Sequence, residues 1–154
     1  MSILADWEIK QLAQEEGMID PFVARQVKEE NGNKILSYGL SSYGYDIRLA
    51  PTQCLLFGRP SAGDCDPKCF NPDILKELEL QQDETGDYFL LPPYGYCLGV
   101  AMERLALPRN VTVVAVGKST YARSGIMVNI TPAEAMWTGY LTLEISNCTG
   151  LFNR

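Results

Sequence analysis

The sequence predicts a mainly β fold of the barrel or jelly-roll kind, preceded by a short N-terminal helix. From Ser37 onward the chain is a series of short runs rich in Tyr, Val, Ile, Leu and Thr. Gly and Pro interrupt these runs at frequent intervals, as expected for many short strands joined by turns. No internal repeat, low-complexity tract or domain boundary is visible, so residues 1–154 are expected to form a single domain.

The first expected element is an amphipathic helix near the N-terminus. Asp6 can cap it, and Gly17 can end it. Ile9, Leu12 and Ala13 fall on one face, which should pack on a larger body. The turn sequence Asn31-Gly32-Asn33 then predicts a hairpin between segments 25–30 and 34–36.

Seven later segments have the composition of strands: 45–49, 53–57, 88–91, 96–103, 111–116, 126–130 and 140–146. Turns are expected at 64–67, 84–87 and 92–95. Segment 72–80 is either a helix, with Ile74, Leu75 and Leu78 on one face, or a loop with a short strand. The far edge of the strand at 140–146 must be covered by other strands or by a neighbouring subunit.

Composition excludes several classes of function. A net charge of -6 and a pI near 4.6 argue against nucleic acid as a partner, because such binding needs a basic surface. No apolar run approaches the length of a membrane span, and an acid interrupts the N-terminus before a signal peptide could form. We therefore expect a cytoplasmic protein whose five cysteines are reduced and mostly buried.

The chain contains no histidine. This excludes the Ser-His-Asp and Cys-His catalytic arrangements and the zinc site of the common nucleobase deaminases. Cys65 and Cys69 form the one close cysteine pair, and two thiols without a second pair make a poor zinc site. We expect no zinc and no metal held by protein ligands, so a carboxylate is the natural proton carrier for hydrolytic chemistry.

Gly117-Lys118-Ser119-Thr120 resembles the end of a Walker A loop. The position of the first required glycine is Thr112, inside a β-branched run, so kinase or ATPase chemistry is disfavoured. If 119–123 form one helical turn, Ser119 and Arg123 share a face and could form a phosphate pocket with Lys118. The alternative is a capped turn whose cations are only solvated.

Alternation along the strand at 140–146 separates two faces. Leu141, Leu143 and Ile145 form an apolar face, which should be the core. Glu144 lies on the opposite, hydroxyl-rich face with Tyr140, Thr142 and Ser146. It is either a solvated strand acid or a general base beside a ligand.

Three motifs follow one another along the chain: Ser41-Ser42-Tyr43-Gly44-Tyr45-Asp46-Ile47-Arg48, the segment 117–126, and Trp137-x-Gly139-x-x-Thr142-Leu143-Glu144-x-Ser146-Asn147. Together they resemble the motifs of bacterial dCTP deaminases. The resemblance covers essentially the whole chain. It implies a homotrimer of the dUTPase-like distorted β-barrel (β-clip) fold, with nucleotide sites between subunits and no zinc, that converts dCTP and water to dUTP and ammonia.

Site residues follow from the resemblance position by position. Glu144 matches the proton donor and acceptor, and Ser119 and Arg123 match its catalytic partners. The segment Lys118, Ser119, Thr120, Tyr121, Ala122 and Arg123 matches the part that holds the nucleotide and its phosphates, while Thr142 and Leu143 match residues that line the base. Mg²⁺ would be bound through the triphosphate, and dTTP is a possible inhibitor. Tyr43, Tyr45, Asp46 and Trp137 are interpreted mainly as turn and packing residues.

The resemblance also has departures. Ala133-Glu134-Ala135-Met136 replaces a stretch that usually carries Pro and a second acid. Family members continue beyond the position of Arg154 through further strands and a C-terminal arm, so we expect these to be missing here. The alternatives to a deaminase are a dUTP diphosphatase, a bifunctional dCTP deaminase and dUTPase, and an inactive nucleotide-binding or subunit-interaction remnant.

Overall fold

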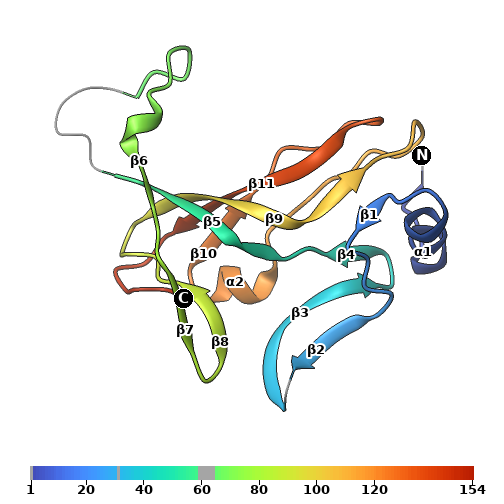
Figure 1. Ribbon diagram of the computed structural model, residues 1–154, viewed down its shortest axis with the longest axis horizontal. Helices are drawn as coiled ribbons and strands as arrows, with labels where there is room; N and C mark the ends of the chain where they lie inside the picture. Colours follow the sequence, from blue (N-terminus) through green and yellow to red (C-terminus); the bar gives the residue numbers. More distant parts are fainter. Residues whose placement is uncertain (1, 31, 59–64) are drawn as a thin grey trace.

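The computed structural model describes residues 2–30, 32–58 and 65–154. Figure 1 shows a long twisted sheet through the middle of the molecule, a smaller sheet beside it, and α1 at one end. The prediction of a mainly β fold with a short N-terminal helix is confirmed. No helix among the described residues is long and apolar enough to cross a membrane.

The main sheet has the strand order β10-β11-β9-β5-β6, and β1 also pairs with β9. All of these pairs are antiparallel. The bounds of its strands are β1 Ile19–Asp20, β5 Leu49–Phe57, β6 Leu75–Glu77, β9 Tyr96–Ala106, β10 Ile126–Asn129 and β11 Thr138–Asn147. Strand β11 thus lies between β9 and β10, so the far edge of the predicted 140–146 strand is covered by other strands of the same chain.

A three-stranded sheet lies beside the main sheet. Its order is β2-β3-β4, with β2 at Gln26–Glu30, β3 at Asn33–Ser41 and β4 at Gly44–Asp46. Glu30 pairs with Asn33, which confirms the predicted hairpin, although Asn31 of its turn lies outside the described residues. A separate hairpin joins β7 (Leu80–Asp83) to β8 (Gly86–Phe89) through the predicted turn at 84–87.

Helix α1 spans Asp6–Glu15 and packs against β3. Ile9 and Ala13 are buried and Leu12 packs beside them, as predicted, and Gly17 follows the helix at φ +67°, where glycine is favoured. The prediction that Asp6 caps the helix is wrong. Ala5 is the N-cap, and the Glu8 side chain reaches back to accept from the Ala5 N–H at 2.8 Å.

The core lies between the main sheet, α1 and the smaller sheet. It contains buried residues from α1, β1, β3, β5, β8, β9, β10, β11 and the segments that connect them: Ile9, Ala13, Met18, Ile19, Leu40, Cys54, Phe89, Leu91, Cys97, Ala101, Leu105, Leu107, Val111, Ile126, Ala133, Leu141, Leu143 and Ile145. All five cysteines are free, but only Cys54 and Cys97 are buried. The expectation that they are mostly buried is therefore wrong, because Cys65, Cys69 and Cys148 lie in exposed loops.

Two predictions of local structure are corrected, and one open alternative is decided. Segment 72–80 is the loop with a short strand rather than the helix: Pro72–Ile74 is a 3-10 turn, and β6 follows because its residues pair with the edge of β5. Segment 45–49 is interrupted between β4 and β5, where the Arg48 N–H bonds to the Glu103 side chain at 2.8 Å instead of a strand. Segment 111–116 is extended but joins no sheet, and one bridge, Val113 to Ala133, is its sole strand-like pairing among the described residues.

The remaining turns can be assigned in the same way. The turn at 92–95 is present, with the Gly95 N–H donating to the Pro92 carbonyl at 3.0 Å. Asp64 of the turn expected at 64–67 lies outside the described residues. Strands β1 and β7 were not predicted, because two and four residues are too short for a clear alternation.

Candidate active site

Strand β11 places Glu144 within the main sheet, between β9 and the edge strand β10. Glu144 lies opposite Leu98 on β9 and opposite Asn129 on β10. Burial alternates along the strand as predicted: Leu141, Leu143 and Ile145 are buried on the core face. Glu144 is half-buried on the other face, where the Asn129 side-chain amide donates a hydrogen bond to its Oε2.

A cavity of about 520 Å³ lies over this face of β11. Two of the predicted site residues, Thr142 and Glu144, line it. The loop before β11 supplies most of the rest, and the complete lining is Ile130, Thr131, Pro132, Ala133, Glu134, Ala135, Met136, Trp137, Tyr140, Leu141, Thr142 and Glu144. Leu143, predicted to line the base, does not line the cavity, because its side chain points into the core and is 6% exposed.

The lining brings together an apolar surface and two acids. Trp137 is half-buried, and its ring lies against Gly139, where an added Cβ would be 3.0 Å from Cζ2. Glu134 is exposed in the same cavity as Glu144. On β9, burial and the charge of Glu144 raise the pKa of Tyr96, so its hydroxyl stays protonated. A flat ligand that carries hydrogen-bonding groups fits such a lining.

The segment Lys118 to Arg123 forms the predicted helical turn. Helix α2 spans Ser119–Arg123, and the Ala122 N–H donates to the carbonyl of Lys118, the N-cap, at 3.2 Å. Gly125 follows the turn at φ +81°. Ser119, Thr120, Ala122 and Arg123 are exposed, whereas Tyr121 packs against the core and burial raises its pKa.

Lys118 is held by the three-stranded sheet. Its Nζ forms an ion pair with the Asp46 carboxylate on β4 and donates to the Ser37 carbonyl on β3 at 3.3 Å. Asp46 also accepts from the Gln26 side chain of β2 at 2.9 Å. The interpretation of Asp46 as only a turn or packing residue therefore missed an ion pair with the candidate site.

The structure separates the predicted site residues into two groups. Helix α2 packs against β10, but no residue of 118–123 lines the cavity that contains Glu144. Across the described parts of the chain, neither a hydrogen bond nor an ion pair joins Ser119 or Arg123 to Glu144. A single copy of the chain thus presents the cavity with Glu144 in one place and the exposed turn with Ser119, Thr120 and Arg123 in another.

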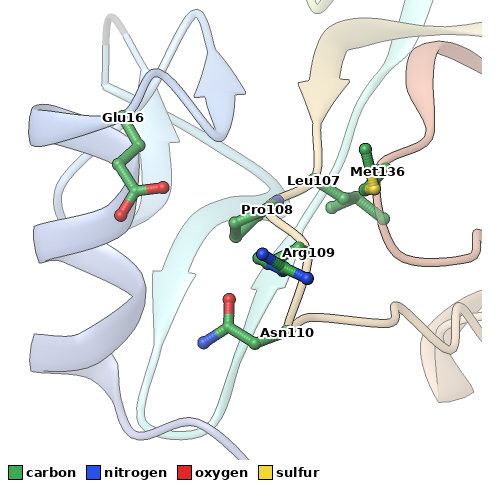
Figure 2. A pocket seen from close by; sticks show the side chains of 6 residues that line it. All are labelled: Glu16, Leu107, Pro108, Arg109, Asn110 and Met136. Carbon is green, nitrogen blue, oxygen red and sulfur yellow. The ribbon is translucent and has the colours of Figure 1, made fainter.

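A second cavity, of about 820 Å³, lies at the end of β9. Figure 2 shows its lining, which consists of Glu16, Leu107, Pro108, Arg109, Asn110 and Met136. It contains none of the predicted site residues, and Met136 is its one residue in common with the cavity at Glu144. Within residues 2–30, 32–58 and 65–154, no three His, Cys, Asp or Glu side chains come together as a possible metal site.

Comparison with known proteins gives consistent matches over the whole chain. The model of a family described as dCTP deaminase-like matches residues 3–152. A dCTP deaminase of Acidithiobacillus ferrooxidans is 48% identical over 151 residues, which are 98% of this chain and 77% of that protein. A dCTP deaminase of Neisseria meningitidis is 46% identical over the same shares of the two chains.

A solved structure also has this fold. The crystal structure of 2'-deoxycytidine 5'-triphosphate deaminase from Agrobacterium tumefaciens matches with a TM-score of 0.57 at 24% sequence identity. The match covers 94% of this chain and 41% of that one, so the present chain spans less than half of that protein's length.

Proposed function

The chain belongs to the dCTP deaminase-like family, and from this premise we propose that it converts dCTP and water to dUTP and ammonia. The observation that carries the proposal is the position of Glu144. This carboxylate lies half-buried on the wall of a cavity whose other residues can contact a planar base. In a chain without histidine, it is the group best placed to move protons there.

The reaction needs one group that first accepts and then returns protons. Glu144 takes a proton from water as the water oxygen bonds to C4 of the cytosine ring, and it passes that proton to N3. It then takes the proton of the new C4 hydroxyl and delivers it to the exocyclic amine, the C4–N bond breaks, and ammonia leaves a uracil carbonyl behind. Asn129 bonds to Oε2 of Glu144 and so leaves Oε1 free for these transfers.

The second half of the site is proposed to come from another copy of the chain. In a homotrimer, Ser119, Thr120 and Arg123 of one subunit would reach the Glu144 cavity of the next and hold the substrate there. The exposed position of these residues and their separation from Glu144 in one chain support this arrangement. Val114 and Val116, which lie in the segment before α2 and are 73% and 80% exposed, offer an apolar surface for such a contact.

Phosphate recognition is assigned to the same turn. The Ser119 and Thr120 hydroxyls and the Arg123 guanidinium are donors suited to a triphosphate. Mg²⁺ is proposed to arrive on the triphosphate, where it would offset part of the phosphate charge.

The free state of all five thiols supports action in a reducing compartment such as the cytoplasm.

A single assay tests the function. The purified chain is incubated with Mg²⁺ and either dCTP or dUTP, ammonia and pyrophosphate are measured together, and dTTP is added in a parallel series as a candidate inhibitor. Ammonia without pyrophosphate supports a deaminase. Pyrophosphate released from dUTP would instead support the diphosphatase or bifunctional alternative.

Two variants test the assigned roles. Glu144→Gln should keep the fold and dCTP binding but lose deamination, and near-normal turnover would contradict the role of Glu144. Arg123→Ala should also be inactive alone. Since the two halves of the site belong to different subunits, mixing and reassembling these two variants should restore activity, whereas an unchanged background rate would refute the shared site.

A further inference from the structure

The Asp46 carboxylate is the centre of a polar cluster that joins the three-stranded sheet to α2. Its Oδ2 accepts from Lys118 Nζ, from Gln26 Nε2 at 2.9 Å and from Ser37 Oγ at 3.2 Å. The Lys118 ammonium also donates to the Ser37 carbonyl at 3.3 Å. Residues of β2, β3 and β4 therefore converge on the residue directly before α2.

The cluster holds the Lys118 ammonium in place, so this group is not simply a surface charge solvated by water. The side chains of Lys118 and Asp46 are 27% and 29% exposed, so this pair is more shielded from water than an open surface pair. Lys118 is also the N-cap residue of α2, and its carbonyl accepts from the Ala122 N–H. Holding the ammonium therefore holds the start of the turn that carries Ser119 and Arg123.

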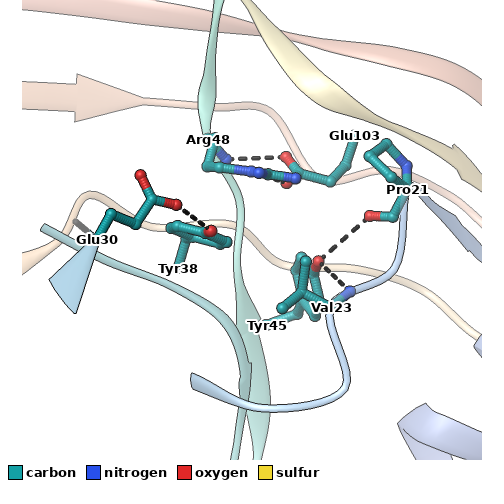
Figure 3. Close-up of polar contacts among 7 residues, drawn as sticks. All are labelled: Pro21, Val23, Glu30, Tyr38, Tyr45, Arg48 and Glu103. Carbon is teal, nitrogen blue, oxygen red and sulfur yellow. Dashed lines mark hydrogen bonds and ion pairs between the residues drawn. The ribbon is translucent and has the colours of Figure 1, made fainter. Parts of the chain in front are cut away.

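Asp46 is itself anchored to the core of the molecule. It pairs with Gly39 in the β3–β4 ladder. Two residues later, the Arg48 N–H and Nε donate to Glu103 at 2.8 and 2.7 Å, as Figure 3 shows. Glu103 lies on β9 and is fully buried. A continuous set of contacts thus runs from the central sheet through Arg48 and Asp46 to α2.

We propose that Asp46 is a positioning residue that acts through Lys118, and that the Lys118 ammonium is a structural strut rather than a phosphate ligand. This inference rests on the proposed function of the Ser119–Arg123 turn. For Lys118 to reach a phosphate, its ammonium would have to leave a half-buried carboxylate. Asp46 would then remain as an uncompensated negative charge near an incoming polyanion.

The test is a double-mutant cycle with Asp46→Asn, Lys118→Met and the combined variant. Each single change should lower kcat between about tenfold and a hundredfold, because a small displacement of catalytic groups has effects of that size. The combined variant should be no worse than the more damaging single one. Lys118→Arg should retain most of the wild-type kcat. Lys28→Met removes an exposed lysine of β2, so it is the matched control for charge and should leave kcat unchanged.

A comparison of the two single variants separates the strut from direct phosphate binding. If Lys118 is a strut, Lys118→Met and Asp46→Asn should weaken dCTP binding by the same factor, because both release the turn that holds the phosphates. If Lys118 binds phosphate, Lys118→Met will weaken dCTP binding far more than Asp46→Asn. In that case Asp46→Asn, which frees the ammonium, should leave dCTP binding unchanged or tighter, and the proposal is overturned.

A measurement without nucleotide keeps this proposal separate from the proposed function. The N–H groups of Ala122, Ser124 and Gly125 are bonded within and just after α2. Their hydrogen exchange, followed at millisecond labelling times, should accelerate in both single variants and no further in the combined one. Accelerated exchange in a chain whose wild type releases no ammonia would retain the strut and refute the deaminase. Unchanged exchange and rate in the variants of an active wild type would refute the strut.

Discussion

Removing the carboxylate of Glu103 should be the most destabilising single change on β9. Glu103 is 0% exposed, and its two oxygens bind two donors of Arg48, at 2.7 Å to Nε and 2.8 Å to the backbone N–H. In Figure 3, the Arg48 guanidinium also lies over Tyr38, 4.4 Å from the ring centroid. Glu103 thus neutralises the charge of the Arg48 guanidinium and also accepts the hydrogen bond of the Arg48 backbone N–H.

The expected cost follows from which partners are lost. Glu103→Gln keeps the shape but loses one charge-assisted hydrogen bond, which is worth about 1.5 to 3 kcal/mol. Glu103→Ala also leaves the Arg48 guanidinium and N–H without their acceptor, so we expect a loss of about 3 to 5 kcal/mol. For a chain of this size, that loss lowers Tm by roughly 6 to 20 °C.

Urea unfolding followed by the fluorescence of the two tryptophans measures these free energies. Protein concentration must be the same for all variants, because subunit association would add to the apparent stability. Glu79→Ala, at an exposed loop position, is the control and should stay within about 0.5 kcal/mol of the wild type. A cost below about 1 kcal/mol for Glu103→Ala would refute the reasoning. The pair Arg48→Met and Glu103→Leu together should cost less than the sum of the single changes, since both charges leave at once.

Two further predictions concern titratable groups. The Cys54 and Cys97 Sγ atoms are buried 3.2 Å apart, and their shared hydrogen bond together with burial raises the pKa of the Cys97 thiol. A thiol reagent should therefore modify three cysteines in the folded chain and five in urea, as counted by mass spectrometry, and five fast sites would contradict the burial. The Arg154 guanidinium and the Thr85 hydroxyl and N–H lower the pKa of Asp83 in the folded chain. Ionised Asp83 therefore stabilises the folded state above the ordinary Asp pKa, and this contribution is lost as the pH falls through the lowered pKa of the folded state. A carboxyl NMR titration should find the pKa of Asp83 below the ordinary Asp value of about 3.9, and Arg154→Met should raise it part of the way back, because the Thr85 donors remain; an identical titration in both proteins would rule out the pair.

The fold was predictable where one face of a strand meets the core. The alternation of Leu141, Leu143 and Ile145 identified β11 and placed Glu144 on its other face. The same kind of composition gave a wrong strand at 111–116, because Val residues favour an extended backbone but do not show whether a partner strand exists. Of the two alternatives for 72–80, the short strand is the one that forms, because pairing with β5 outweighs a weak helical periodicity.

The sequence predicted residues of the candidate site but not which side chains contact one another there. Sequence spacing identified the turn with Ser119 and Arg123, yet Asp46 lies 72 residues from Lys118 and no local pattern links them. Glu134 was noted only as a departure from the family, although it lines the cavity with Glu144. Glu103 did carry a signal: it occupies a core-facing position of a strand in which Cys97, Ala101 and Leu105 are all buried. A charged residue in such a row indicates a buried partner, but only the structure identifies Arg48.

Residues on the two faces of β11 are under different kinds of natural selection, one for stability and the other for chemistry. Substitutions at Leu143 and Ile145 should alter how much folded protein a cell contains, whereas those at Thr142 and Glu144 should alter what each folded molecule can do. Natural selection can therefore tune abundance and chemistry almost independently along ten consecutive residues. Neutral variation along this strand should accordingly have a period of two, with one set of tolerated residues at the core positions and another between them.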